Sequence, residues 1–334
     1  MNGLKKNAHR IARARHQAGL TLVEMMIALA IGSFLMIGAV SVFVNGRDAQ
    51  RTSDTLARMQ ENARLALSVL ETELLHAGYW GMNSTPGLIQ GTADDGDPVA
   101  FPVAGDCGVN FSVNLLRPID GVNNGYGLGC AANGGGAQPN ADTLVIRRAS
   151  IEATPPTAGR LQVQTDRLRG QIFNDGAVPG GFPAAPDSAT HDLVTRAYYI
   201  AQGSSVGANV PGLRRKTLQA GPSIADEEII PGVEDFQVQL GVDTSLPGTA
   251  GRGTVNRYVN PGHAILDPAS PIFDPDAQVV AVRLWLVLRS ENQEGSFRDD
   301  RARAYADQDL AATNDRFRRA LVSKTIFLRN RRSI

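Results

Sequence analysis

The feature that most constrains this chain is an apolar run near its start, from Leu20 to Val44, which carries a single charge at Glu24. At about 1.5 Å per residue, a helix of this length crosses the hydrocarbon core of a bilayer, which is roughly 30 Å thick. The run is therefore predicted to be a transmembrane helix. A carboxylate in such a helix costs free energy, so we expect Glu24 to have a partner.

The residues before this run set its orientation in the membrane. They include five basic side chains and no acidic one: Lys5, Lys6, Arg10, Arg13 and Arg15. The positive-inside bias keeps such a segment in the cytoplasm. Everything after Val44 is therefore predicted to be exported.

Two simpler interpretations of the N-terminus fit the residues less well. A cleaved secretory signal has a possible small-residue site at Ala28-Leu29-Ala30, but cutting there leaves an apolar region of only about eight residues with Glu24 inside it. The apolar run also continues well past that site. A plain signal anchor explains the length and the orientation but gives Glu24 no purpose.

A basic leader ending in Gly19, followed by Leu20-Thr21-Leu22-Val23-Glu24 at the start of a long apolar helix, resembles the prepilin signature of type IV pilins and type II secretion pseudopilins. The resemblance implies cleavage after Gly19 by a membrane prepilin peptidase and N-methylation of the new terminus at Leu20. It also implies a single-pass protein of the bacterial inner membrane with a periplasmic head. Leu20 stands where major pilins usually have phenylalanine, and no proline interrupts the apolar helix, as in many minor pilins.

This resemblance suggests a partner for the acidic side chain in the apolar helix. In a helical filament, the carboxylate of Glu24 can face the cationic amine of Leu20 on a neighbouring subunit, which neutralises both charges. Such a pair favours one axial offset between helices, whereas the surrounding apolar surface tolerates many. Glu24 is therefore expected to be the assembly residue.

Beyond the membrane the apolar pattern becomes amphipathic instead of stopping. Apolar residues recur at steps of three and four, which predicts one apolar stripe along the helix: Leu56, Met59, Ala63, Leu67, Leu70 and Leu74. The charged residues are predicted to lie largely off that stripe: Arg58, Glu61, Arg64, Glu71 and Glu73. The helix is predicted to continue to about Ala77 and to stop at Gly78, with a soft joint at Asn45-Gly46.

The rest of the chain is predicted to form an antiparallel β-rich head. Strands are expected at 142–148, 191–201, 234–243, 277–290 and 324–330, with 277–290 central because it is apolar on both faces. Long loops are expected at 82–140 and 150–189, and Tyr79 and Trp80 as core anchors below the head. The fold class is thus α+β, organised as a leader (1–19), a transmembrane helix (20–44), an amphipathic stalk (45–78) and a head (79–334).

The two cysteines, Cys107 and Cys130, both lie in the exported part. An oxidising periplasm favours a disulfide between them, and two unpaired thiols are the alternative. Neither cysteine stands in a CxxC or near a pair of histidines, which argues against redox catalysis and zinc.

Other signals for a ligand or for catalysis are weak. Asp94, Asp95 and Asp97 surround Gly96 and form a weak calcium candidate, without the spacing of an EF-hand. The glycine-rich stretch 123–140 lacks the GK[ST] of a phosphate loop and is expected to be a flexible loop. No serine or cysteine has a recognisable nucleophile context, so no cofactor and no enzymatic activity are expected.

The net charge also bears on possible partners. Removal of the leader would leave 28 basic against 33 acidic residues, since the leader holds five of the 33 basic ones. A mildly acidic protein is poorly suited to binding nucleic acid by bulk charge.

Four further stretches resemble PilW-type minor pilins: "LARMQENARLALSVLETELLHAGYWG", "IIPGVEDFQVQLGVD", "VVAVRLWLVLRS" and "DRFRRALVSKTIFLRNR". That family implies a low-abundance subunit that, with other minor pilins and a tip adhesin, primes pilus assembly at the inner membrane and then sits at the tip of a fibre built of major pilin. The pilus would serve twitching motility and adhesion. A J-type minor pseudopilin of type II secretion and a membrane-anchored periplasmic enzyme are the alternatives.

Overall fold

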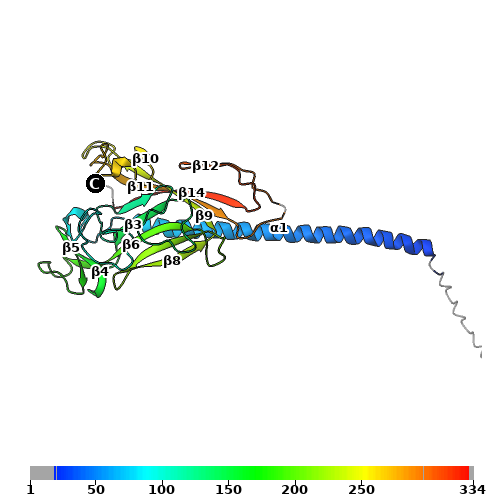
Figure 1. Cartoon of the computed structure of the whole chain (residues 1–334), viewed down its shortest axis with the longest axis horizontal. Coiled ribbons are helices and arrows are strands. Elements are labelled where there is room, and N and C mark those ends of the chain that lie inside the picture. The colour runs from blue at the N-terminus through cyan, green and yellow to red at the C-terminus, as the bar shows by residue number, and fades with distance from the viewer. Residues whose placement is uncertain (1–18, 20, 296, 331–334) are drawn as a thin grey trace, which may run out of the picture. The chain divides into compact units, whose positions relative to one another are not determined.

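A computed structural model describes residues 19, 21–295 and 297–330 of the chain (Figure 1). The chain divides into two compact units, Met1–Thr55 and Leu56–Ile334, and helix α1 (Leu22–His76) contributes to both. The predicted leader apart from Gly19, together with Leu20, lies outside the described residues. The helix continues through Asn45 and Gly46 without a break, as predicted, and the soft joint expected there stays a prediction.

In the first unit, α1 presents apolar side chains that are all exposed, as expected of a segment that meets lipid instead of protein. Within the described residues, α1 is the helix that is long and apolar enough to cross a membrane. Length and composition alone also fit a signal sequence. The residues that favour a membrane anchor are therefore those of the prepilin motif, from Gly19 to Glu24.

In the second unit, one face of α1 is buried in the head. The buried residues are Met59, Ala63, Ala66, Leu70, Glu73 and Leu74. Four of them belong to the predicted apolar stripe: Met59, Ala63, Leu70 and Leu74. Leu56, also predicted on the stripe, is exposed instead, and Glu73, predicted off the stripe, is buried. The helix ends as predicted at Gly78, whose φ of 72° suits glycine and whose N–H donates to the carbonyl oxygen of Arg147 at 3.1 Å.

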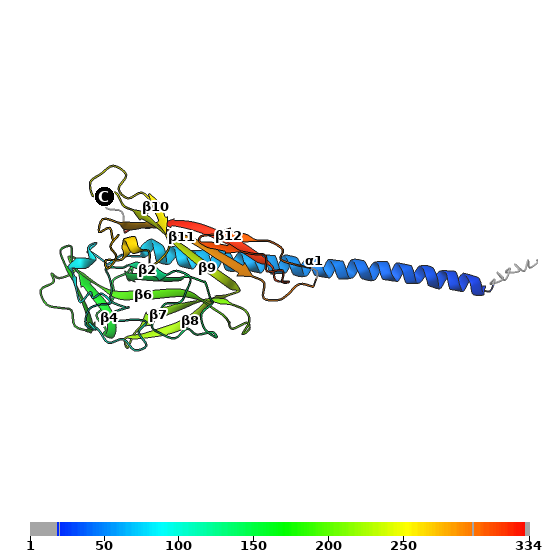
Figure 2. The same cartoon turned by 45° about the horizontal axis from the view of Figure 1, so that its top comes forward.

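The larger sheet runs in the order β1-β5-β4-β6-β3-β2, and β7 and β8 extend from β6 (Figure 2). Its strand pairs are antiparallel except for the parallel pair β1 and β5. The strands are β1 (Ile89–Gln90), β2 (Ile119–Val122), β3 (Thr143–Ala149), β4 (Ala158–Thr165), β5 (Gly170–Asp175), β6 (Ala189–Ala201), β7 (Gly212–Gln219) and β8 (Ser223–Pro231). A short 3-10 helix, η1 (Pro86–Leu88), leads into β1.

The smaller sheet has the order β10-β9-β11-β14 and is antiparallel throughout. Its strands are β10 (Arg257–Val259), β9 (Val233–Asp243), β11 (Gln278–Arg289) and β14 (Arg319–Phe327), with the 3-10 helix η2 (Ala264–Leu266) before β11. A separate hairpin joins β12 (Arg303–Tyr305) to β13 (Gln308–Leu310). The central position predicted for 277–290 is confirmed, because β11 lies between β9 and β14.

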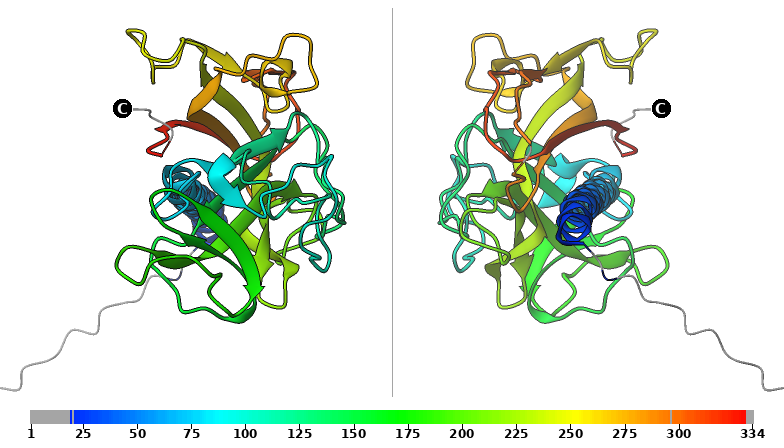
Figure 3. Two further views of the ribbon diagram at one scale, coloured as in Figure 1. Left: turned by 90° about the vertical axis from the view of Figure 1, so that its left-hand side faces the viewer. Right: turned by 90° about the vertical axis from the view of Figure 1, so that its right-hand side faces the viewer.

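The main core lies between the two sheets and the buried face of α1. Figure 3 shows the helix with one sheet on either side of it. Side chains from all three meet in one cluster, including Leu70 of α1, Tyr198 of β6, Phe236 of β9 and Leu284 of β11. Trp80 is buried in a second cluster against which Tyr79 packs, as expected of core anchors. The predicted α+β class, with a long N-terminal helix against an antiparallel head, is confirmed.

Several predicted loops contain strands. The region 150–189 holds the hairpin of β4 and β5, and 82–140 holds β1 and β2. The strands β7 and β8 were also missed, because their central residues are charged instead of apolar. Here Arg214, Arg215 and Lys216 lie opposite Glu228, Glu227 and Asp226, so opposite charges pair across the two strands.

Candidate functional site

The predicted assembly residue, Glu24, lies in the first turn of α1 and forms a capping box with Thr21. The Thr21 hydroxyl accepts from the Glu24 N–H at 3.2 Å, and the Glu24 carboxylate accepts from the Thr21 N–H at 3.0 Å and from its hydroxyl at 2.9 Å. The T-x-x-E spacing of Thr21 and Glu24 is a capping-box signal that is visible in the sequence. In the single chain, the carboxylate of Glu24 therefore caps the N-terminus of its own helix.

The predicted processing residues lie just before this turn. Gly19 is exposed, and a side chain added there would meet nothing within 4 Å, while Leu20 lies outside the described residues. The cleavage after Gly19 and the contact between Glu24 and a neighbouring subunit therefore stay proposals.

A second charged feature, missed by the sequence analysis, joins the stalk to the head. The carboxylate of Glu73, on α1, receives two hydrogen bonds from Arg148 of β3, at 3.1 and 3.2 Å, and another from Arg196 of β6. Glu73 is 5% exposed and Arg148 is 9% exposed. One buried carboxylate thus binds two arginines from neighbouring strands, and it fixes the rotation of α1 against the larger sheet more tightly than apolar packing alone.

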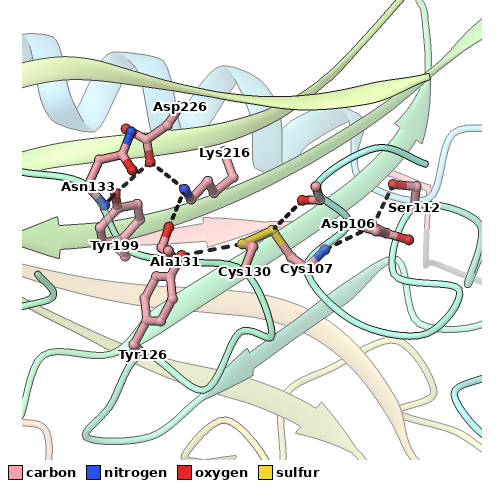
Figure 4. Close-up of a disulfide and its surroundings, with 11 residues drawn as sticks. Asp106, Cys107, Ser112, Tyr126, Cys130, Ala131, Asn133, Tyr199, Lys216 and Asp226 are labelled. Carbon is pink, nitrogen blue, oxygen red and sulfur yellow. Dashed lines mark hydrogen bonds and ion pairs between the residues drawn. A yellow bond between two sulfur atoms is a disulfide. The ribbon is translucent and has the colours of Figure 1, made fainter. Parts of the chain in front are cut away.

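The disulfide between Cys107 and Cys130 closes a loop that is bound to the larger sheet (Figure 4). The phenol of Tyr126 lies 3.4 Å from the sulfur of Cys130, and its ring meets Tyr199 of β6 edge to face with 4.9 Å between centroids. The ammonium of Lys216 donates to the carbonyl of Ala131 at 2.6 Å. The stretch expected to be a flexible loop is therefore anchored to β6 and β7.

An ionised carboxylate completes this anchor. Asp226 accepts a hydrogen bond from the Tyr199 hydroxyl at 2.6 Å and lies 2.9 Å from Lys216 and 2.6 Å from Arg214. Burial opposes ionisation of Asp226, but these hydrogen bonds outweigh it and lower its pKa. The charge of Asp226 therefore stabilises the fold above the ordinary aspartate pKa, and this contribution is lost as the pH falls below it.

The disulfide should contribute measurably to stability. Replacing both Cys107 and Cys130 with serine should lower the free energy of unfolding by about 3 kcal/mol, because the unfolded chain regains the entropy of an open loop of this length. Thermal unfolding of the full chain in detergent, with and without reductant, measures the effect. Reductant should lower the melting temperature of the wild type and leave the double variant unchanged; equal responses would contradict the prediction.

A buried acid, Asp142, lies just before β3 and is 1% exposed. Its carboxylate accepts the N–H groups of Asn124 and Val238, each at 2.7 Å. Burial raises the pKa of Asp142 to about 7, against the effect of these N–H groups, and the nearby carboxylates of Asp307 and Asp235 raise it further. Asp142 therefore exchanges a proton near neutral pH.

This shift predicts a pH dependence with a definite sign. Between pH 4 and 7 the folded state holds a proton on Asp142 that the unfolded state has lost, so the contribution of Asp142 to stability falls as the pH rises through this window. From pH 5 to 8, the stability of the wild type should fall by about 2.5 kcal/mol relative to Asp142→Asn. Urea unfolding of both proteins at several pH values measures this, and parallel pH profiles would contradict it.

The weak calcium candidate forms a turn held by its own hydrogen bonds. Asp97 accepts the N–H of Asp94 at 2.8 Å, and the carboxylate of Asp94 accepts from the side chain of Asn114 at 2.8 Å. Across the described residues, no three acidic, histidine or cysteine side chains converge in a way that could hold a metal ion. These contacts give the calcium site at Asp94, Asp95 and Asp97 no added support, and it stays a prediction.

The three histidines after the leader make separate contacts. His76 contacts the carbonyl of Thr72 within α1, His191 contacts the carbonyl of Ser150 at 2.8 Å beside Tyr79, and His263 caps η2. Each is thus engaged with the nearby backbone, and in the described part of the chain none of these contacts joins a histidine to a hydroxyl or thiol group.

Comparison with known proteins gives two family matches. Residues 14–40 match the prokaryotic N-terminal methylation motif, and residues 197–330 match the Type IV Pilus-assembly protein W family, PilW. The second match runs from within β6 to the end of β14 and so covers the whole smaller sheet. A search of the curated proteins finds no significant match.

Among solved structures, a type IV-like pilin, TTHA1219 from Thermus thermophilus, is similar to this chain. The two are 14% identical, the alignment covers 83% of this chain and 99% of the other, and the TM-score is 0.33.

A methylation motif that extends into a long apolar helix, whose other end packs against a largely antiparallel head, is the arrangement of a type IV pilin-like protein. Within that class, the C-terminal region, residues 197–330, is similar to the PilW family of pilus-assembly proteins. Such a protein has a structural role in pilus assembly, and its N-terminus is consistent with anchoring in a membrane.

Proposed function

We propose that this minor pilin primes the assembly of type IV pili at the bacterial inner membrane, together with other minor pilins and a tip adhesin. Its head lies in the periplasm before assembly and at the tip of the major-pilin fibre afterwards. The pilus then supports twitching motility and adhesion. The observation that carries this proposal is the PilW match of the head behind a methylation motif, with an acidic side chain at a fixed offset in the apolar helix.

Maturation is the first step of this proposal. A prepilin peptidase cleaves after Gly19, and the amine of Leu20 is then methylated. The exposure of Gly19 and the absence of nearby atoms support access by an enzyme. The new terminus lies one residue before Thr21, so maturation creates a positive charge beside the capping box.

Assembly is the second step. The carboxylate of Glu24 exchanges its bonds with Thr21 for the amine of Leu20 on a neighbouring subunit, in surroundings where no water competes. The pair sets the axial offset between two helices. The buried contacts of Glu73 with Arg148 and Arg196 keep the head in register with its own helix, so that the offset also positions the heads.

A deletion of the gene for this chain tests the proposal in the bacterium that makes it. We expect loss of twitching on agar and of pilin in the sheared surface fraction, with both restored by the wild-type chain, while protein secretion stays intact. Loss of secretion with normal twitching would contradict the proposal and assign the chain to type II secretion instead. Normal results in both assays would exclude both roles.

A further inference from the structure

The head contains a cleft of about 850 Å³ that the proposed assembly contacts do not use. One wall comes from the disulfide loop, with Val109 and Leu116, and the opposite wall from the segment around η2, with Leu266 and Phe273. The cleft therefore opens where connections of the two sheets meet. Its volume falls within the usual range for ligand sites, roughly 300 to 1,000 Å³.

The floor of the cleft consists of buried side chains from both sheets. Apolar side chains of β3, β9 and β11 line it, namely Val145, Leu240 and Val279. Among them lies Arg147, which is 2% exposed and donates to the carbonyls of Phe111 and Arg117, each at 2.7 Å. Asp120 lies 3.9 Å from the same guanidinium. Partners in its own chain thus hold Arg147, so it acts as part of the floor.

The ionisable side chains that line the cleft are mostly acidic. Five aspartates and two arginines face the cleft: Asp94, Asp95, Asp120, Asp267, Asp274, Arg117 and Arg147. Arg117 lies near Asp94 and Arg147 near Asp120, both at 3.9 Å, so two of the negative charges have a cation beside them. Among the ion pairs of the described residues, none includes the other three, so the cleft favours a cationic occupant.

The rim is apolar as well as acidic. Val109 is 48% exposed, Leu116 is 46% exposed and Phe273 is 37% exposed, and all three line the cleft. The exposed carboxylate of Asp267 and the half-buried one of Asp274 stand in the wall that also holds Phe273. A free cation would leave the apolar side chains in water, whereas a polypeptide with basic and apolar side chains would contact both.

We propose that this cleft is a docking site for a short basic segment of another polypeptide. Its lysine or arginine side chains face Asp267 and Asp274, and its apolar side chains pack on Val109, Leu116 and Phe273. The disulfide supports one wall, because Cys107 lines the cleft and its carbonyl accepts the N–H of Gly129 at 2.8 Å. This inference concerns the head alone and does not depend on the assembly role proposed above.

Fluorescence anisotropy with the full chain in detergent tests this proposal. The probe is a labelled six-residue peptide of alternating lysine and leucine, and the comparison peptide alternates glutamate and leucine. The double variant Asp267→Asn with Asp274→Asn removes two cleft charges. The carboxylate of Asp267 accepts the N–H of Ala269 at 3.0 Å, and that of Asp274 accepts the N–H of Asp276 at 2.9 Å. The side-chain oxygen of an asparagine can keep each of these bonds.

A matched control removes the same charge elsewhere. Asp175 at the end of β5 accepts the N–H of Ala177 at 3.0 Å in the same kind of turn, and Asp187 is exposed on the next loop. The control is the double variant Asp175→Asn with Asp187→Asn. A third variant, Leu116→Ser with Phe273→Ser, tests the apolar rim without changing charge.

We expect the lysine peptide to bind the wild type and the control equally, and to bind the charge and rim variants about fivefold more weakly or worse. The glutamate peptide should not bind. Equal binding to all four proteins would overturn the proposal. Displacement of the peptide by spermidine at an equal concentration would overturn it as well, because the site would then take a small cation instead of a polypeptide.

Discussion

Replacing Glu73 with alanine should lower the free energy of unfolding by about 3 to 5 kcal/mol, the largest effect on stability that we expect from a charged residue of this protein. The substitution leaves Arg148, which is 9% exposed, without its counter-charge, and removes the partner of Arg196 as well. Chemical unfolding of the full chain in detergent measures the loss.

The same helix offers a matched control two residues away. Glu71 lies 2.6 Å from Lys324 of β14, and both side chains are more than a third exposed. Removing such a pair should cost less than about 1 kcal/mol, so Glu71→Ala should unfold nearly as the wild type does. If Glu73→Ala cost no more than Glu71→Ala, the buried contact would not be what joins the stalk to the head.

Changing Glu24 to alanine should leave the protein in the membrane but lower its incorporation into surface pili about tenfold or more. The reason is that the charged terminus of a neighbouring subunit would then have no partner in the apolar interior. Immunoblots of the membrane fraction and of sheared pili measure insertion and incorporation separately.

Thr21 provides the control for this experiment, because Glu24 also caps its own helix. Thr21→Ala removes the hydroxyl that bonds to Glu24 and keeps the carboxylate, at a cost of about 1 kcal/mol in helix stability. Its incorporation should stay close to that of the wild type. Equal losses in the two variants would assign the effect to capping, and normal incorporation of Glu24→Ala would contradict the role proposed for the charge.

The elements predicted well are those whose apolar pattern has one clear period. The alternation from Phe236 to Val242 correctly predicted β9, and the apolar run in 277–290 correctly predicted the central strand β11. The stop of α1 at Gly78 followed from glycine's tolerance of positive φ. In these segments local composition and tertiary packing favour the same structure.

The elements that were missed depend on partners far away in the sequence. In β7 and β8 the apolar period is replaced by a basic and an acidic triplet, and only their pairing shows that both are strands. Glu73 lies three residues after Leu70, a step that keeps it on the buried face of the helix. Its burial, however, depends on two arginines that lie 75 and 123 residues further along the chain. The positions of these charges along the chain do not show which of them pair in the fold.

Intact-mass spectrometry of the protein from the membranes of cells that make it tests the central claim most directly. A prepilin processed as proposed has a mass that begins at Leu20 and includes one added methyl group, while the disulfide between Cys107 and Cys130 removes two hydrogens. A mass that begins at Met1 would contradict the proposed processing, because the amine would then stand 23 residues before Glu24. A mass that begins just after Ala30 would contradict it as well, because Glu24 itself would have been removed.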